Sequence, residues 1–181
     1  MTHRAAFRPA RADDAAAIAA IYNQGIAERG ATFETEPRCA ADMAARIADD
    51  SYPLLVAVED GIVLGWASLS SYRPRACYAG IAEFSIYLDG AARGRGIGRG
   101  LLEALVDAAR GRGCWKLVSR VFPFNAASRA LCRACGFREV GVYEKHGRLD
   151  GRWLDVVIVE RLIPENISPN NPVVAAGDAA Y

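Results

Sequence analysis

A single carboxylate stands among apolar residues in the segment IAEFSIYL, residues 81–88. Side chains alternate between the two faces of a strand, so Glu83 shares its face with Ser85 and Tyr87. Burial among apolar neighbours favours the neutral form of a carboxylate, which suits a group that must accept a proton near pH 7. The segment therefore indicates general-base catalysis by Glu83. A strand glutamate that is paired with an arginine, or lies at a sheet edge, is the structural alternative.

Glycines and arginines alternate in AARGRGIGRG, residues 91–100, just before the apolar pattern LLEALVDAAR. Glycines let the backbone approach a ligand closely, and the start of a helix offers unpaired N–H groups and a positive dipole. The glycine spacing fits neither the dinucleotide fingerprint nor the P-loop. The stretch favours a pyrophosphate as its ligand. A solvated basic loop that caps the helix is the alternative.

Two arginines flank a proline in Arg73-Pro74-Arg75, shortly before the segment that contains Glu83. In an extended segment, residues two apart point the same way, and proline stiffens the chain. Guanidinium groups suit bidentate recognition of carboxylate or phosphinate oxygens. The pair is a candidate clamp for an anionic substrate, and a charged surface loop is the alternative.

The chain has five cysteines, an odd and scattered set that is typical of reduced thiols used as small apolar residues. Cys132 and Cys135 have the C-x-x-C spacing, but a zinc site needs two further ligands and no second pair is present. We therefore predict no metal site.

The elements that must position these residues follow from periodicity and turn signals. Helices are expected from Asp13 or Asp14 to Gly30 and over residues 40–48, 97–110 and 126–134. Strands are expected over residues 7–10, on both sides of Asp60-Gly61, over 81–88 and 116–122, and in a last hairpin around HGRLDG, residues 146–151. The order β-α-α-β-β-β-α-β-α-β-β predicts an α/β fold with a mixed sheet.

Length and composition limit the organisation and the partners. The 181 residues suit a single domain over 1–163, followed by a flexible tail over 164–181 that is rich in Pro, Asn and Ala. With 22 basic and 21 acidic residues, the chain lacks the charge of a general nucleic-acid binder. No apolar run could span a bilayer and no signal peptide is apparent, so we expect a cytoplasmic protein without a membrane partner.

Two motifs resemble those of the GCN5-related N-acetyltransferase (GNAT) superfamily. Arg93-x-x-Gly96-x-Gly98 resembles its acetyl-CoA motif, Gln/Arg-x-x-Gly-x-Gly/Ala, and NAASRALCRACGF, residues 125–137, resembles its next signature. TFETEP (32–37), Arg75 and Tyr78, and DGRWLDV (150–156) resemble the phosphinothricin acetyltransferase-like branch. The resemblance covers about residues 4–162.

The resemblance implies a GNAT fold and transfer of the acetyl group of acetyl-CoA to the α-amine of an amino-acid-like antimetabolite. Phosphinothricin, arsinothricin and methionine sulfoximine are the types of substrate implied, and acetylation would detoxify them. It also implies a homodimer. Acetylation of a peptide N-terminus or a polyamine, and a non-catalytic acetyl-CoA sensor, are the alternatives.

The same resemblance implies roles for individual residues. Glu83 would be the base, and Cys132 stands where many members have the tyrosine or histidine that protonates the leaving thiolate. A cysteine could do this weakly, water could substitute for it, or the reaction needs no acid, and a packed helix thiol is the favoured interpretation of Cys132. Residues implied to bind acetyl-CoA are Ile86, Tyr87, Leu88, Arg93, Gly94, Arg95, Gly96, Ile97, Gly98, Asn125 and Ser128. Residues implied to bind the substrate are Phe33, Arg73, Arg75 and Tyr78.

Overall fold

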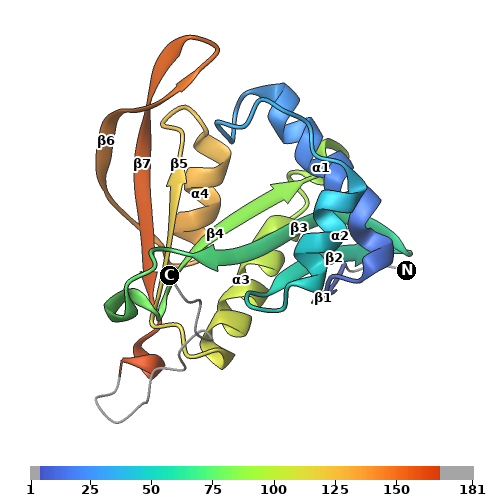
Figure 1. Cartoon of the computed structure of the whole chain (residues 1–181), viewed down its shortest axis with the longest axis horizontal. Helices are drawn as coiled ribbons and strands as arrows, with labels where there is room; N and C mark the ends of the chain where they lie inside the picture. Colours follow the sequence, from blue (N-terminus) through green and yellow to red (C-terminus); the bar gives the residue numbers. More distant parts are fainter. Residues whose placement is uncertain (1–4, 168–181) are drawn as a thin grey trace.

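A twisted seven-stranded sheet forms the centre of the computed structural model, which describes residues 5–167 (Figure 1). The strands are β1 (Ala6–Pro9), β2 (Leu54–Glu59), β3 (Ile62–Ser71), β4 (Ile81–Leu88), β5 (Lys116–Val121), β6 (Arg138–Leu149) and β7 (Arg152–Leu162). They lie in the order β1-β2-β3-β4-β5-β7-β6. Neighbouring strands are antiparallel except β4 and β5, which are parallel. The predicted mixed α/β sheet is confirmed.

Helices cover both faces of this sheet. They are α1 (Ala15–Glu28), α2 (Ala40–Ala48), α3 (Ile97–Gly111) and α4 (Ala126–Ala134). On one face, Ile18 of α1 and Met43 of α2 pack on Val56 and Trp66. On the other face, Leu101 and Leu105 of α3 join a larger core with residues of β4, β5 and β7. No helix in the described part of the chain is long and apolar enough to cross a membrane.

The predicted turn between β2 and β3 is confirmed, since Asp60 and Gly61 have φ of 51° and 80°. This conformation suits a two-residue hairpin and favours glycine. Helix α1 differs slightly from the expectation. It ends at Glu28, and Arg29 rather than Gly30 takes the left-handed conformation, with φ of 56°.

The last hairpin differs more. The predicted hairpin around HGRLDG is confirmed, but residues 146–149 belong to β6, so the turn itself is the pair Asp150-Gly151 alone. Both residues of the pair have positive φ, as a tight hairpin requires. Strand β6 is irregular just before this turn, between Tyr143 and Gly147, where Lys145 has φ of 47°. A regular strand pattern is therefore interrupted in this part of the sequence.

The chain remains packed for a few residues beyond residue 163, where the expected domain ends. Pro164–Asn166 form a 3-10 turn, and the Asn166 side chain donates to the carbonyls of Arg110 and Cys114 at 2.9 and 2.8 Å. Ile163 is buried in the main core. The remainder of the predicted tail, residues 168–181, lies outside the described residues.

A gap opens between β4 and β5, where two neighbouring strands separate (Figure 1). The strands pair only from Ile81 to Glu83, opposite residues 116–118. The Ser119 hydroxyl then donates to the Phe84 carbonyl at 2.9 Å, and the pairing ends. Beyond this point β4 remains paired with β3 up to Leu88 and β5 remains paired with β7 up to Val121, so the two parts of the sheet diverge. The second half of β4 therefore faces a gap on one side.

Candidate active site

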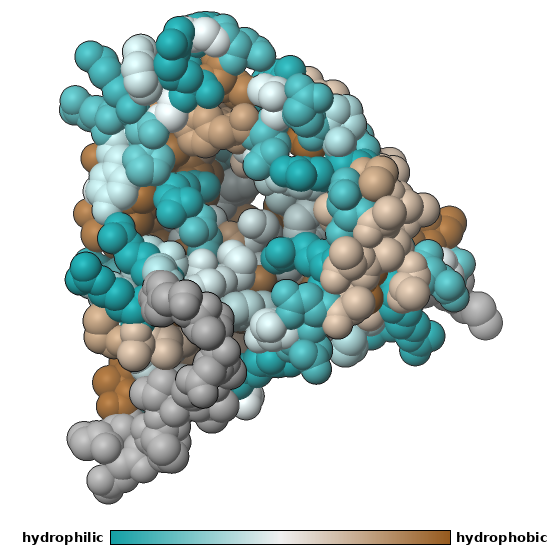
Figure 2. Space-filling view, in the orientation of Figure 1, coloured by the Kyte–Doolittle hydropathy of each residue, from teal (hydrophilic) through white to brown (hydrophobic). Residues whose placement is uncertain are grey.

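A pocket of about 450 Å³ lies at this gap. The loop after α1, both separating strands and the start of α4 line it, and the surface is hollowed there between the β6–β7 hairpin and helices α1 and α2 (Figure 2). Residues that the sequence proposed for the site and that line this pocket are Phe33, Glu83, Ile86, Tyr87, Asn125, Ser128 and Cys132. One pocket thus gathers the candidate base, part of the cofactor set and one substrate residue.

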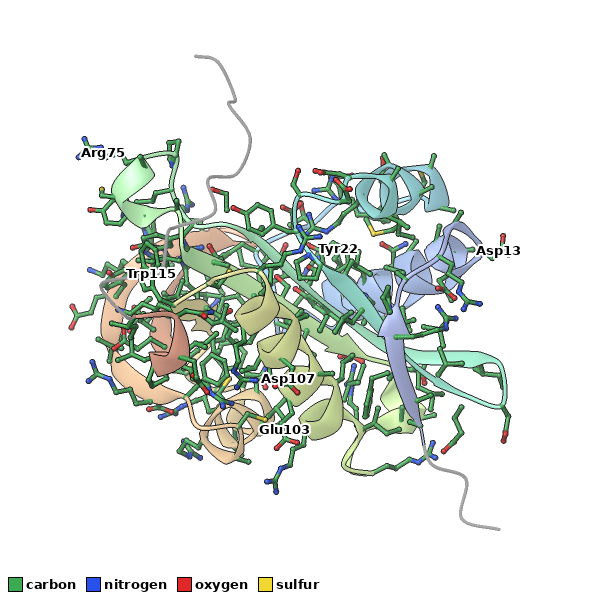
Figure 3. The ribbon with its side chains drawn as sticks, turned by 90° about the horizontal axis from the view of Figure 1, so that it is seen from below. Asp13, Tyr22, Arg75, Glu103, Asp107 and Trp115 are labelled. Carbon is green, nitrogen blue, oxygen red and sulfur yellow. The ribbon has the colours of Figure 1, made fainter. Side chains whose placement is uncertain are left out.

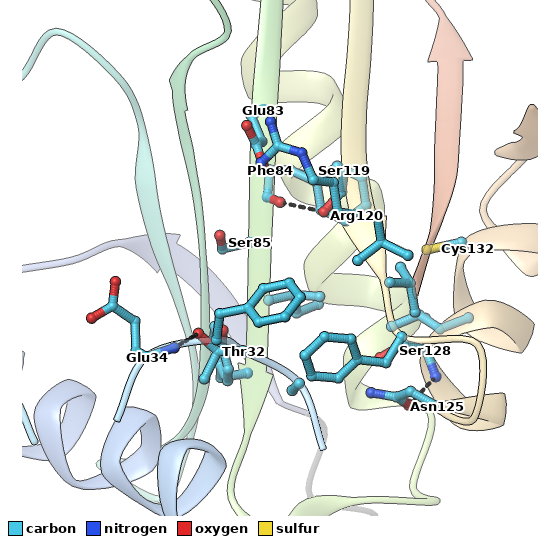
Figure 4. Close-up of a pocket in the computed structure, with 18 of the residues that line it drawn as sticks. Thr32, Glu34, Glu83, Phe84, Ser85, Ser119, Arg120, Asn125, Ser128 and Cys132 are labelled. Carbon is cyan, nitrogen blue, oxygen red and sulfur yellow. Dashed lines mark hydrogen bonds and ion pairs between the residues drawn. The ribbon is translucent and has the colours of Figure 1, made fainter. Parts of the chain in front are cut away.

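Glu83 does not stand alone among apolar side chains. The Arg120 guanidinium donates to its carboxylate at 2.7 Å, and the Glu83 side chain is 23% exposed (Figure 4). The expectation of an isolated carboxylate is therefore wrong, and the arginine pairing that was left as the alternative is present. The parallel register sets this contact, because Glu83 lies opposite Val118 and Arg120 is two residues further along the same face.

The backbone of β4 divides its hydrogen-bonding groups between two sides. The Phe84 carbonyl accepts from Ser119 on β5, whereas the Glu83 carbonyl accepts from Ser70 on β3 at 3.4 Å. Because these groups alternate along a strand, the amides of Ile86 and Leu88 face the gap. The amide of Tyr87 faces β3, so it does not face the gap as the amides of Ile86 and Leu88 do.

The Tyr87 side chain has a packing role. Its ring stacks on Trp66 with centroids 4.9 Å apart and meets the edge of Tyr22 at 4.8 Å. Burial raises the pKa of Tyr87, which keeps the phenol neutral. Gly25 allows the ring to approach α1, since a Cβ there would lie 2.9 Å from a ring carbon.

The glycine stretch leads directly into α3. Gly94 and Gly96 have φ of 75° and 79°, and α3 begins at Ile97. The first amides of a helix have no partner within that helix, so they are available to an anion. A Cβ at either glycine would meet no atom within 4 Å, so these positions need glycine for backbone conformation rather than for space.

The arginines of this stretch are engaged with carboxylates. Arg93 pairs with Glu28 at 2.9 Å, and Arg95 pairs with Glu59 at 2.5 Å. Arg93 also donates to the Leu88 carbonyl at 3.3 Å. Their charges are largely balanced by these partners, so the backbone amides are the better candidates for holding a pyrophosphate.

Asn125 joins two walls of the pocket. Its side-chain oxygen accepts from the Ser128 amide at 3.0 Å and caps α4, while its Nδ2 donates to the Gly30 carbonyl at 3.0 Å (Figure 4). The sequence proposed Asn125 and Ser128 as cofactor contacts. The structure shows in addition that Asn125 fixes the loop after α1 to the start of α4.

Replacing Asn125 with alanine removes both hydrogen bonds and is expected to lower the free energy of unfolding by about 1–3 kcal/mol. Thermal and urea denaturation measure this loss. Asn125→Asp keeps the capping oxygen and removes only the donor to Gly30, so it should cost less than Asn125→Ala. Equal stability of the alanine variant and the wild type would contradict this role.

Cys132 lines the pocket but is a poor acid. Burial raises the pKa of its thiol to about 12, well above the value of about 8.5 for an ordinary thiol. Proton transfer from Cys132 to a leaving thiolate is then uphill. The packing supports the reading as a helix thiol, because Cys132 and Cys135 are both buried in the main core. Within residues 5–167, no group of three or more His, Cys, Asp or Glu could hold a metal ion.

Three of the predicted substrate residues lie elsewhere. Arg73, Arg75 and Tyr78 line a second pocket of about 340 Å³, and Arg75 points away from the body of the molecule (Figure 3). The connection from β3 to β4 runs outward and is held by an edge contact between Tyr72 and Tyr78. The structure therefore does not bring these residues into the main pocket. Phe33 does lie there, edge-on to Phe122 with centroids 4.9 Å apart.

The sequence did not single out several residues that line the main pocket. They include Thr32, Glu34, Ser119, Arg120 and His146. Thr32 and Glu34 lie within the TFETEP segment already noted. Arg120 carried no local signal, because its place depends on strand pairing.

Comparisons with known proteins agree with this geometry. The Acetyltransferase (GNAT) family matches residues 19–137, which is more than half of the chain. The chain belongs to the GNAT family. It is 41% identical over 159 residues to phosphinothricin N-acetyltransferase of Alcaligenes faecalis, with 85% of this chain and 80% of the relative covered. It is 36% identical over 170 residues to the L-methionine sulfoximine/L-methionine sulfone acetyltransferase of Pseudomonas paraeruginosa, with 91% and 99% covered.

A solved structure of the family contains the acetyl donor. The GNAT superfamily phosphinothricin acetyltransferase of Sinorhizobium meliloti, in complex with acetyl-CoA, superposes with a TM-score of 0.86 at 33% identity and covers 96% of this chain and 99% of its own. This GNAT chain is thus an acetyl-CoA-dependent N-acetyltransferase. The gap beside β4 and the glycine turn before α3 fit a donor with a thioester at one end and a pyrophosphate in its middle.

Proposed function

We propose that this GNAT enzyme acetylates the α-amine of amino-acid-like antimetabolites of the phosphinothricin, arsinothricin or methionine sulfoximine type, which detoxifies them. The observation that carries the proposal is one pocket that combines Glu83 with Ile86, whose amide faces the gap beside β4. The names of the two relatives above support the substrate class.

In the proposed reaction, Glu83 accepts a proton from the substrate ammonium, directly or through water. The free amine attacks the thioester carbon, a C–N bond forms and the C–S bond breaks. The amides of Ile86 and Leu88 donate to the carbonyl oxygen as negative charge develops on it, which is often the largest single contribution in acyl transfer. The attacking nitrogen then loses its second proton, which passes to the departing thiolate directly or through water, so the step needs no acid from Cys132, whose pKa is raised by burial. Amides at the start of α3 hold the pyrophosphate.

The proposed substrate contacts are an aromatic residue in the main pocket and two arginines in the second pocket. Phe33 borders the side chain of the substrate within the main pocket. Arg73, Arg75 and Tyr78 line the separate second pocket, and we propose that the two arginines bind a second anionic head such as a phosphinate where a substrate reaches that pocket. Guanidinium forks match such paired oxygens.

Replacing Arg75 with alanine should raise KM for phosphinothricin by about ten-fold or more, the usual effect of losing a charge-assisted hydrogen bond. KM for acetyl-CoA should change by less than about two-fold, since the lesion is distant from the cofactor. Steady-state kinetics with each substrate varied in turn measure both values. Arg112→Ala, which removes a guanidinium that contacts the Ser51 carbonyl at 2.9 Å, is the matched control. A rise confined to KM for acetyl-CoA would refute the assignment.

A thiol-release assay with acetyl-CoA tests the function itself. The panel contains phosphinothricin, arsinothricin, methionine sulfoximine, a polyamine and a peptide with a free N-terminus. Turnover should be highest with the amino-acid analogues. Preference for the peptide or the polyamine would replace the proposed substrate class. Binding of acetyl-CoA without turnover of any amine would favour a sensor.

We also propose a cytoplasmic homodimer. Large apolar side chains are exposed on β6, the edge strand, and on its neighbour β7: Val140, Val142, Tyr143, Trp153 and Leu162. A second copy that packs on one face of this hairpin would cover part of them, and burial of exposed apolar side chains favours association. Light scattering after size exclusion should give twice the chain mass, and Val142→Lys should shift the protein toward the monomer. A wild-type monomer at micromolar concentration would contradict the dimer.

A further inference from the structure

A permanent cation stands next to the candidate base. Among the described residues that line the main pocket, Arg120 is the one arginine, and no lysine lines it. Its guanidinium donates to Glu83 through one nitrogen, Nη1, and its side chain is 42% exposed (Figure 4). Glu83 and Arg120 therefore lie side by side in the pocket where the substrate amine must bind.

We propose that Arg120 binds the α-carboxylate of the substrate, so that the Glu83–Arg120 pair recognises the zwitterion of an α-amino acid. This inference deepens the proposed function and rests on it. An α-amino acid carries its ammonium and carboxylate on one carbon, which matches two adjacent protein charges of opposite sign. The substrate ammonium pairs with Glu83 and the substrate carboxylate pairs with Arg120. Two ion pairs between enzyme and substrate therefore replace the one between Glu83 and Arg120.

The surroundings of Arg120 favour this exchange. Among residues 5–167, Glu83 is the one carboxylate within 4.0 Å of Arg120. The next acidic group along the sheet, Glu160, is already engaged by Lys116 and Arg138. A partly exposed ion pair is weak, so a substrate can replace it. The remaining N–H groups of the Arg120 guanidinium can donate to both oxygens of a carboxylate.

Arg120 and the pair Arg73 and Arg75 lie in different pockets. Arg120 binds the carboxylate that all α-amino acids share, and this inference does not depend on Arg73 or Arg75. Arg120 is expected to decide between an amino acid and a simple amine. It should have little influence on the choice between one amino-acid side chain and another.

A matched pair of substrates tests this assignment: L-methionine sulfoximine and the amine with the same side chain and hydrogen in place of the carboxylate. Arg120→Gln should lower the preference of kcat/KM for the amino acid over the amine by about ten-fold or more, mainly through KM. Because Arg120 also contacts Glu83, kcat/KM for the amine can change as well, so the ratio of the two kcat/KM values is the readout. Arg120→Lys keeps the charge without the fork and should retain part of the preference.

Controls separate this role from others. Arg110→Gln removes a guanidinium that pairs with Asp107 at the far end of α3, and it should keep the wild-type preference. Thermal melting and the affinity for acetyl-CoA show that each variant is folded. An unchanged preference in Arg120→Gln would overturn the proposal. An equal fall of kcat on both substrates would also overturn it, because Arg120 would then only position Glu83.

Failure of the proposed function is visible separately, as absence of turnover by the wild type with every amine. Calorimetric titration of L-methionine sulfoximine then decides the role of Arg120. Binding by the wild type that is lost in Arg120→Gln and partly kept in Arg120→Lys supports it. Equal binding by wild type and Arg120→Gln, or no binding by wild type, overturns it.

Discussion

Glu83→Gln is expected to lower kcat/KM for acetyl transfer at pH 7 by about 10²–10⁴-fold, the usual contribution of a general base. The α-amine of an amino acid is mostly protonated at neutral pH, so the reaction needs a proton acceptor. Glutamine keeps the shape of the side chain and can still contact Arg120, but it cannot accept the proton. The loss therefore reports on chemistry rather than on packing.

The pH dependence of this variant has a definite sign. As pH rises toward the pKa of the amine, more substrate arrives as the free base, so the difference between Glu83→Gln and wild type should shrink. Rates from pH 6 to pH 10 measure this trend. Glu103→Gln, on the surface of α3 and paired with Arg99, is the matched control and should behave as wild type (Figure 3). Full activity of Glu83→Gln at pH 7 would show that the base lies elsewhere.

Gly96→Val is expected to raise KM and Kd for acetyl-CoA by about ten- to hundred-fold. Gly96 has φ of 79°, and a β-branched residue in that region costs about 1–3 kcal/mol, which the turn can relieve only by moving its amides. Gly98→Val should also weaken the binding of acetyl-CoA, but through a steric contact rather than through backbone strain. Its Cβ would lie 3.0 Å from Leu88 Cδ1, so it would press on the strand that borders the gap.

Arg93→Ala is the informative comparison for these glycine variants. Its guanidinium already pairs with Glu28 and contacts the Leu88 carbonyl, so its loss should change the affinity for acetyl-CoA by less than about five-fold. Calorimetry measures the affinities, and thermal melting separates binding from folding. A larger effect for Arg93→Ala than for Gly96→Val would show that charge, rather than the amides, holds the pyrophosphate.

Local signals predicted the elements well. The expected bounds of α2, α4 and β4 agree with the structure, because periodicity and neighbouring glycines mark these segments within a few residues. The motif at Arg93 to Gly98 likewise depends on adjacent residues. These are features that a short window of sequence contains.

Contacts between distant segments were harder to predict. Arg120 and Glu83 are 37 residues apart, and the register of two parallel strands brings them together. The outward path of the loop that carries Arg73 and Arg75 likewise depends on the fold and has no signal in adjacent residues. The pairing of β5 with β7, which opens the gap, is equally non-local.

The alternation along β4 has a consequence for how the enzyme can diversify. The side chains of Phe84, Ile86 and Leu88 pack with the α3 core, and the amides of Ile86 and Leu88 face the gap, whereas Glu83 and Ser85 present side chains to the pocket. A main-chain amide survives every substitution except proline. Acceptor specificity can therefore drift by point mutation while the acetyl-binding function is inherited intact, and a proline at residue 86 would separate the two.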